Sequence, residues 1–237
     1  GLNFTRHYLL DNGSYAGNGS DFSVGNILGH IGVADNLMQL VKFTREGGKD
    51  VLLANWQAHY RDGKDTVFTS DYFGVMRDQL EERLDCHFAY IAGAGGDTIS
   101  NSKIPGNIKT ADYISHGKAL SDLAVNIAQK FEKAETGKIQ VMKYAHPTPM
   151  KTSTSVTMDV TLYAFSLGEV AFACAPYEMF GVSGREIKDN SPYDMTFVMG
   201  YCNGAVSYLP TAEAYEFGCY EADIGKFVPG TAEALAE

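Results

Sequence analysis

The chain has 237 residues, of which 45% are apolar and 20% are charged, the composition of a globular protein. Its net charge of −10 argues against a nucleic-acid partner, because phosphate binding needs a basic face, and against simple electrostatic docking on anionic lipid. No stretch approaches 18 uninterrupted apolar residues, so no membrane span is expected. A lipid-like small molecule remains a candidate ligand, since an apolar pocket could receive it.

The beginning of the chain predicts an irregular segment followed by a β-hairpin. Residues 1–35 are rich in Gly, Asn and Ser and predict an irregular arm. Two apolar stretches, 37–44 and 50–58, then predict strands, and the turn Arg-Glu-Gly-Gly-Lys-Asp between them predicts that they pair as a hairpin.

Helices and strands alternate over the rest of the chain. A helix is expected over 69–84, where apolar residues recur at helical spacing and Ser70 or Asp71 can cap the first turn. The other expected elements, in chain order, are a strand over 86–93, a helix over 111–135, strands over 139–145, 155–166 and 170–174, a helix over 177–189 and a strand over 194–202. Because no repeat or linker divides the chain, we predict one α/β domain over 1–237, with mixed β-sheets packed against flanking helices.

Several common catalytic and ligand-binding motifs are absent from the sequence. The four cysteines form no Cys-x-x-Cys pair, which argues against a zinc finger: Cys86, Cys174, Cys202 and Cys219. There is no His-Glu-x-x-His motif and no Gly-x-Ser-x-Gly nucleophile elbow, and the glycine-rich turn at 93–97 lacks the Lys-Ser/Thr pair of a phosphate-binding loop. The usual serine hydrolase is therefore not predicted, and any metal site must draw its ligands from distant segments.

A glycine-rich turn, Gly-Ala-Gly-Gly-Asp at residues 93–97, has two interpretations. It departs from the dinucleotide-binding fingerprint, because Thr98 stands where the last glycine is needed. A tight turn at a strand end would need its glycines for backbone conformation alone. Alternatively, Gly93, Gly95 and Asp97 form the wall of a substrate pocket, where the backbone approaches a ligand closely.

Two side chains follow buried strands, in the position where α/β sheets deliver residues to a site. His59 follows the apolar strand 51–55, and Glu178 follows the apolar run 170–174 and Pro176. Each has a structural alternative. A lone histidine is more often a core residue than a metal ligand, and a glutamate near a helix start compensates the helix dipole.

The run from Asn203 to Glu221 combines tyrosines, a Pro-Thr pair and glutamates close to the end of the chain. A solvated loop needs few aromatic residues, and a buried helix carries fewer charges. The composition therefore predicts a surface that is half apolar and half polar, which is either a packing corner or an active site.

Taken in order, these segments resemble the neutral, non-lysosomal ceramidase family along nearly the whole chain. The resemblance rests on five stretches: LANWQAH at 53–59, TSDYFG at 69–74, GAGGD at 93–97, APYEMFGVSGREI at 175–187 and GYCNGAVSYLPTAEAYEFGCYE at 200–221. The last stretch is the most specific, because its Asn, Tyr, Pro-Thr, Glu-x-Tyr and Gly-x-Tyr-Glu all match the pattern of the family.

The resemblance also implies roles for individual residues. It implies a zinc site formed by His59, Glu178 and Tyr208, with the phenol of Tyr208 also stabilising charge. It implies that Tyr220 helps to hold the oxyanion of a tetrahedral intermediate. Arg6, in the opening FTRHY, matches an arginine that the family places near the substrate carbonyl.

The activity implied by the resemblance is zinc-dependent hydrolysis of N-acyl sphingoid lipids to a fatty acid and a sphingoid base, in a secreted or cell-envelope protein. Zinc would polarise the amide carbonyl and lower the pKa of a bound water to about 7. The tyrosines would supply hydrogen-bond donors in a dry pocket.

One feature of the family has no counterpart in this chain. The family takes a further zinc ligand and its general base from a His-x-His motif on an early strand, whereas His7 and His30 here stand alone. We expect that motif upstream of Gly1 in a longer chain. Two alternatives stay open: a non-catalytic ceramidase-like domain that binds a lipid or glycan, and a zinc amidase or esterase acting on another small substrate.

Overall fold

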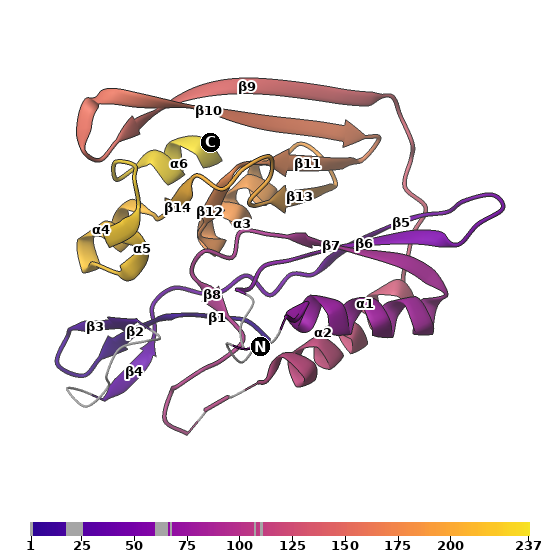
Figure 1. Cartoon of the computed structure of the whole chain (residues 1–237), viewed down its shortest axis with the longest axis horizontal. Helices are drawn as coiled ribbons and strands as arrows, with labels where there is room; N and C mark the ends of the chain where they lie inside the picture. The colour runs from indigo at the N-terminus through magenta and orange to yellow at the C-terminus, as the bar shows by residue number, and fades with distance from the viewer. Residues whose placement is uncertain (1, 18–25, 60–65, 67, 107, 110) are drawn as a thin grey trace.

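The structure is a computed structural model that describes all residues except 1, 18–25, 60–65, 67, 107 and 110. It has mixed β-sheets with helices on their outer sides (Figure 1), which confirms the predicted α/β class. Within the described residues, no helix is both long and apolar enough to cross a membrane.

A three-stranded sheet contains the predicted hairpin. Its strands are β5 (Gln39–Phe43), β6 (Asp50–Trp56) and β7 (Cys86–Ala92). β5 and β6 pair antiparallel, and β7 adds in parallel to β6. Two helices cover one face of this sheet: α1 (Asp71–Leu84) and α2 (Tyr113–Ala128). Fully buried side chains fill the space between them, including Trp56, Met76 and Leu120.

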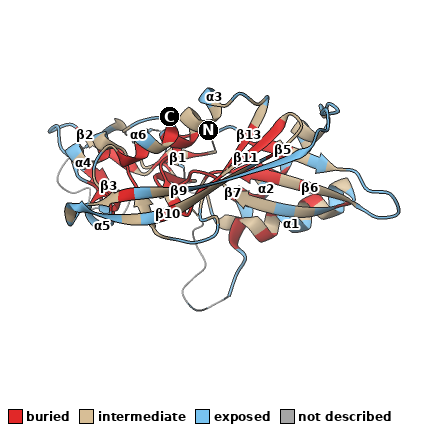
Figure 2. Ribbon diagram, turned by 90° about the horizontal axis from the view of Figure 1, so that it is seen from above, coloured by how far each residue is buried: buried red, intermediate tan, exposed pale blue. Residues whose placement is uncertain are grey.

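A second, four-stranded sheet packs on the other face of the first. Its strands, in spatial order, are β13 (Met195–Met199), β11 (Val170–Cys174), β10 (Ser153–Leu167) and β9 (Ile139–Met150). Phe172 and Phe197 contact Leu53 and Ile91 of the first sheet, so apolar side chains from both sheets share one core. Figure 2 shows the buried residues gathered at β11 and β13.

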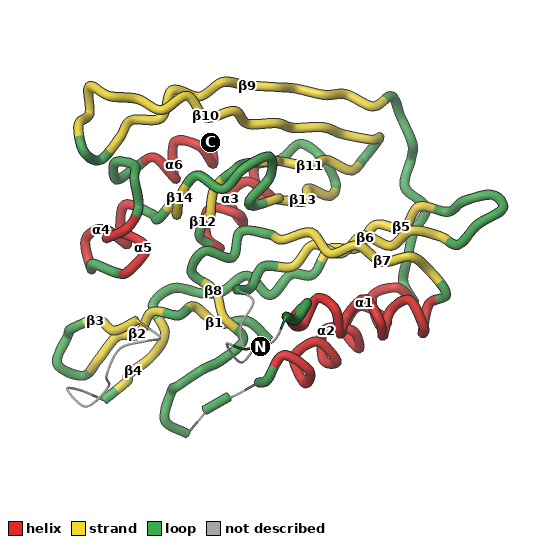
Figure 3. Tube along the Cα trace, in the orientation of Figure 1, coloured by secondary structure: helices red, strands yellow, loops and turns green. Residues whose placement is uncertain are grey.

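The helices of the C-terminal part of the chain gather around a short parallel pair of strands, β12 (Tyr177–Met179) and β14 (Ser207–Leu209). The helices here are α3 (Gly181–Asn190), α4 (Ala212–Phe217), α5 (Tyr220–Ile224) and α6 (Thr231–Ala236). Figure 3 shows α4 to α6 near this pair and away from α1 and α2. This corner is where the C-terminal tyrosines lie.

The prediction that residues 1–35 form an irregular arm is wrong for the part that the structure describes. The segment contains β1 (Phe4–Thr5), β2 (His7–Leu10), β3 (Tyr15–Gly17) and β4 (Ile27–His30). β2 lies between β3 and β4, and β1 pairs with β8 (Thr98–Ile99). Strands of two to four residues are too short to show a period of two, and the described turn between β2 and β3 contains Asn12, Gly13 and Ser14.

The other predicted elements are present with shifted ends. α2 ends at Ala128 rather than near residue 135, and β9 extends to Met150. The helix expected over 177–189 starts only at Gly181, because Tyr177–Met179 pairs with β14 as a strand.

β9 lies at the edge of its sheet and much of it is exposed. It pairs with β10, and along residues 139–149 no other described strand pairs with its outer side. Its first half carries large exposed apolar side chains: Ile139, Val141, Met142 and Tyr144. Pro147 and Pro149 stand in its second half.

The packing of α1 on α2 predicts the effect of one substitution. A Cβ at Gly117 would lie 2.6 Å from Cβ of Val75 and 2.9 Å from the carbonyl oxygen of Tyr72. Helix propensity alone would make Gly117→Ala stabilising by about 1 kcal/mol. Because overpacking costs about 1–3 kcal/mol and one neighbour is backbone, we expect a net loss of stability of up to about 2 kcal/mol, measured by urea unfolding.

Gly29→Ala is the matched control for this prediction. Nothing lies within 4 Å of a Cβ at that position, so we expect a change of about 1 kcal/mol or less. Equal unfolding midpoints for the two variants would show that α1 and α2 are not in such close contact.

Candidate metal and catalytic site

His59 is held by backbone contacts just beyond the end of β6. Its N–H donates to the carbonyl oxygen of Thr98 at 3.0 Å, and its Nδ1 lies 2.7 Å from the carbonyl oxygen of Gly95. A carbonyl only accepts hydrogen bonds, so Nδ1 carries the proton. The lone pair of Nε2 is left free for another partner, which is how proteins orient metal-binding histidines.

The free nitrogen of His59 faces two oxygens from neighbouring strands. Glu178 of β12 and Tyr208 of β14 are paired in register. Nε2 of His59 lies 3.0 Å from Oη of Tyr208 and 3.6 Å from Oε2 of Glu178. The structure therefore brings together the three side chains that the sequence predicted as metal ligands.

Burial controls the protonation of these groups. Burial and the charge of Arg6 lower the pKa of His59, against the opposing effects of Gly95 and Glu178. Burial raises the pKa of Tyr208 to about 12; Arg6 opposes this shift and Glu178 adds to it. At neutral pH the imidazole is uncharged, and the phenol donates its proton to Nε2.

This set of donors fits a zinc ion chemically. An imidazole nitrogen, a carboxylate oxygen and a phenol oxygen converge, and the imidazole is fixed in the tautomer that a metal requires. Tyr208 would give up the shared hydrogen bond when its oxygen binds a cation.

The glycine-rich turn brings the strands of the site together. Gly93 donates its N–H to the carbonyl oxygen of Trp56 at 2.9 Å, and Gly96 donates to that of Met179 at 2.7 Å. A Cβ on Gly96 would lie 2.6 Å from the carbonyl oxygen of Glu178. The glycines at 93, 95 and 96 are buried, Gly95 and Gly96 against protein backbone and Gly93 against the side chain of Gln57. A role of Gly93, Gly95 and Asp97 as a pocket wall stays a prediction.

Asp97, the last residue of the turn, connects it to two other segments. Its Oδ1 accepts a hydrogen bond from the N–H of Gly181 at 2.7 Å, at the start of α3. Its carbonyl oxygen accepts one from the N–H of Arg6 at 2.8 Å. Burial raises the pKa of the Asp97 carboxyl, although the Gly181 bond opposes this. The turn thus positions the backbone of Arg6.

The two remaining side chains predicted to act in the site, Arg6 and Tyr220, both lie close to Tyr208. The guanidinium carbon of Arg6 is 5.4 Å from the centre of the Tyr208 ring. The ring of Tyr220 is 6.1 Å from that of Tyr208, with 73° between their planes. Tyr220 is 63% exposed, the least buried of the predicted site residues that surround Tyr208.

Comparison with solved structures shows that the chain has a known fold. The structure of neutral ceramidase from Pseudomonas aeruginosa superposes with a TM-score of 0.69 and 13% sequence identity, over 86% of this chain and 45% of that one. A ceramidase complexed with C2 matches with the same score and identity, over 86% of this chain and 46% of its own. The chain shares the fold of neutral ceramidase. No family model and no curated protein matches the sequence.

The match covers only part of the ceramidase structures. The chain spans less than half the length of these ceramidases, and at 13% identity the likeness concerns the fold. The convergence of His59, Glu178 and Tyr208 is seen in the side chains of this chain itself and does not depend on the comparison.

Sequence reasoning missed a second cluster next to this site. Metal-binding atoms of His7, Cys219 and Glu221 lie within 4.8 Å of one another, and all three residues are buried. This cluster already contains a cation, because Arg6 forms an ion pair with Glu221. Burial raises the pKa of Cys219 to about 12, which disfavours a thiolate ligand. The only sequence signal was the end of the Gly-x-Tyr-Glu pattern at Glu221.

His30, the other isolated histidine near the start of the chain, makes its contacts outside this cluster. His30 makes a hydrogen bond of 2.9 Å with the hydroxyl of Ser102 and stacks on Phe4.

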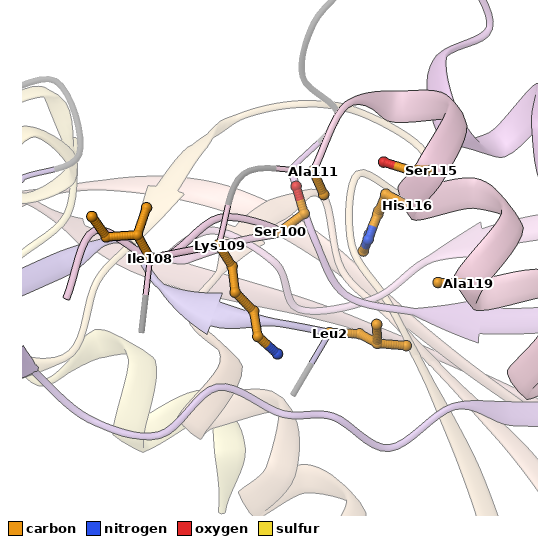
Figure 4. Close-up of a pocket in the computed structure, with 8 residues that line it drawn as sticks. All are labelled: Leu2, Ser100, Ile108, Lys109, Ala111, Ser115, His116 and Ala119. Atoms are coloured by element: carbon orange, nitrogen blue, oxygen red, sulfur yellow. The ribbon is translucent and has the colours of Figure 1, made fainter. Parts of the chain in front are cut away.

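A cavity of about 400 Å³ lies away from these residues, beside the first turn of α2 (Figure 4). It is lined by Leu2, Ser100, Ile108, Lys109, Ala111, Ser115, His116 and Ala119. None of the predicted site residues is among them, so the candidate site does not rest on this cavity.

The cluster around Glu221 predicts a pH dependence of stability. Burial opposes ionisation of Glu221, but the hydrogen bond from His7 and the charge of Arg6 prevail and lower its pKa to about 2 from 4.5. Because the pKa is lower in the folded chain, this stabilisation is present above pH 4.5 and is lost as the pH falls toward 2. It is on the order of 3 kcal/mol.

Urea unfolding between pH 7 and pH 3 measures this effect. We expect the stability advantage of the unchanged chain over Glu221→Gln to shrink as the pH falls below 4.5. An advantage that stays constant over this range would contradict the prediction.

Proposed function

We propose that this chain carries the metal-binding part of a zinc-dependent amide hydrolase that cleaves N-acyl sphingoid lipids to a fatty acid and a sphingoid base. His59, Glu178 and Tyr208 would hold the zinc ion. When bound, zinc would polarise the amide carbonyl and lower the pKa of a bound water to about 7.

One observation carries the proposal. Nε2 of His59 faces Oη of Tyr208 at 3.0 Å and Oε2 of Glu178 at 3.6 Å, while Gly95 fixes the opposite ring nitrogen. A core histidine would instead be expected to have both nitrogens satisfied away from a carboxylate. The shared fold with neutral ceramidase adds support at the level of architecture.

Arg6 and Tyr220 would serve the developing negative charge. Both lie close to the ring of Tyr208, and their side chains carry N–H and O–H donors. As water adds to the amide carbon, the carbonyl oxygen gains charge, and donors fixed in advance stabilise it. The C–N bond breaks and the amine leaves, taking up the proton that the attacking water has given up.

A second candidate function is a ceramidase-like domain that binds a lipid without catalysis. It is favoured by the sequence, which has no His-x-His motif to complete a four-ligand site with a general base. A zinc titration separates this candidate from the hydrolase.

The titration compares the unchanged chain with three single variants, His59→Ala, Glu178→Gln and Tyr208→Phe, by isothermal calorimetry. We expect each to weaken zinc binding by about tenfold or more, because each removes one donor from the ligand set. His87→Ala is the matched control, since His87 is an exposed histidine on β7, and we expect it to bind zinc unchanged. Equal binding by all five proteins would overturn the ligand assignment.

Substrate class is tested separately with the zinc-loaded chain. Because the chain has no His-x-His motif to supply a general base, we expect slow fatty acid release from an N-acyl sphingosine and still slower cleavage of a short, polar N-acetyl amide. Cleavage of the polar amide alone would retain the amidase chemistry and refute the lipid substrate. Zinc binding without cleavage of either compound would favour the binding domain.

A further inference from the structure

Glu221 is a buried carboxylate held between two basic side chains. It lies in α5, immediately after Tyr220, and is 1% exposed. Its Oε1 forms an ion pair with the guanidinium of Arg6, and its Oε2 lies 2.8 Å from Nε2 of His7. Each oxygen of the carboxylate therefore has its own partner.

The local backbone explains how two consecutive residues reach the same carboxylate. In an extended strand, Arg6 and His7 would point to opposite faces. The chain instead bends at Arg6, between the end of β1 at Thr5 and the start of β2 at His7. The hydrogen bond from the N–H of Arg6 to the carbonyl oxygen of Asp97 fixes this bend.

His7 fixes the far side of the carboxylate. Its ring contacts those of Phe180 and Phe217, with centroid distances of 5.7 and 5.4 Å. Its carbonyl oxygen accepts a hydrogen bond from the N–H of Ile31 at 2.9 Å. With its ring and its backbone both held, His7 can donate to Glu221 from one position only.

The other end of the network reaches the candidate metal site. Arg6 lies over the ring of Tyr208, and its Nε is a buried donor without a hydrogen-bond partner among the described residues. A free arginine side chain samples many rotamers and loses that freedom when it is placed, so this placement needs a fixed partner. The charge of Glu221 also offsets that of Arg6, which would otherwise repel a cation bound by Tyr208.

We propose that Glu221 is a positioning residue that orients Arg6 toward Tyr208 and the substrate carbonyl, with His7 anchoring the carboxylate from the opposite side. The catalytic consequence rests on the proposed function. The orientation of Arg6 does not, and it can be measured without any reaction.

The first experiment follows Arg6 directly by NMR of arginine Nε–H groups in the full chain, with Arg6→Lys identifying its signal. We expect a sharp, slowly exchanging signal in the unchanged chain and a broadened or lost one in Glu221→Gln, which places an amide donor against the guanidinium. Glu216→Gln is the matched control, because Glu216 is an exposed glutamate of α4. An Arg6 signal that is unchanged in Glu221→Gln overturns the proposal.

Glu221→Asp covers the case in which Glu221→Gln does not fold. It keeps the charge but withdraws the carboxylate by one methylene group. We expect this variant to remain folded, with an Arg6 signal that exchanges faster than in the unchanged chain. A folded Glu221→Asp chain with an Arg6 signal as protected as before overturns the proposal.

Kinetics then test the catalytic consequence. For the N-acyl sphingosine, we expect Glu221→Gln to lower kcat by about 100-fold with less than a threefold change in KM, as for loss of an oxyanion donor. A normal kcat together with a disordered Arg6 would overturn the catalytic consequence. If the unchanged chain binds no zinc and cleaves nothing, the proposed function fails, while the NMR result still decides the positioning role.

Discussion

The contact between the backbone of Gly96 and that of β12 is the constraint on which the site depends. The N–H of Gly96 donates to Met179, and no side chain larger than hydrogen fits at this position beside Glu178. The preceding residue, Gly95, supplies the carbonyl that orients His59. A wider separation between turn and strand would move the acceptor of His59 away from Glu178, and the two candidate ligands would no longer face each other.

The rest of the site is built from segments that are far apart in the sequence. Arg6 comes from the bend after β1, His59 from the end of β6, and Tyr208 from β14. The two sheets and their shared core fix the distances between these elements, because packed interiors deform little. The tyrosines near the end of the chain therefore lie beside side chains from distant segments. Arg6 and His59 come from the first part of the chain, and Glu178 comes from β12.

The sequence was informative where a local pattern exists. His59 and Glu178 were predicted because each follows a buried strand, and Tyr208 and Tyr220 because a long, ordered stretch resembles a known family. The pairing of His7 with Glu221 spans 214 positions and leaves no local pattern, so it could not be predicted. The short strand Tyr177–Met179 was hidden for a related reason, since its pairing with β14 is decided by tertiary contacts rather than by periodicity.

The exposed edge of β9 has a consequence for how this chain meets other chains. A twelve-residue edge strand with apolar side chains offers unpaired backbone groups that can accept a strand from outside, the usual start of aggregation. Pro147 and Pro149 lack the N–H that such a strand would need, so an added strand is stopped in the second half of β9. A foreign strand can therefore pair only with the first half of β9, which begins at Ile139 and precedes the prolines.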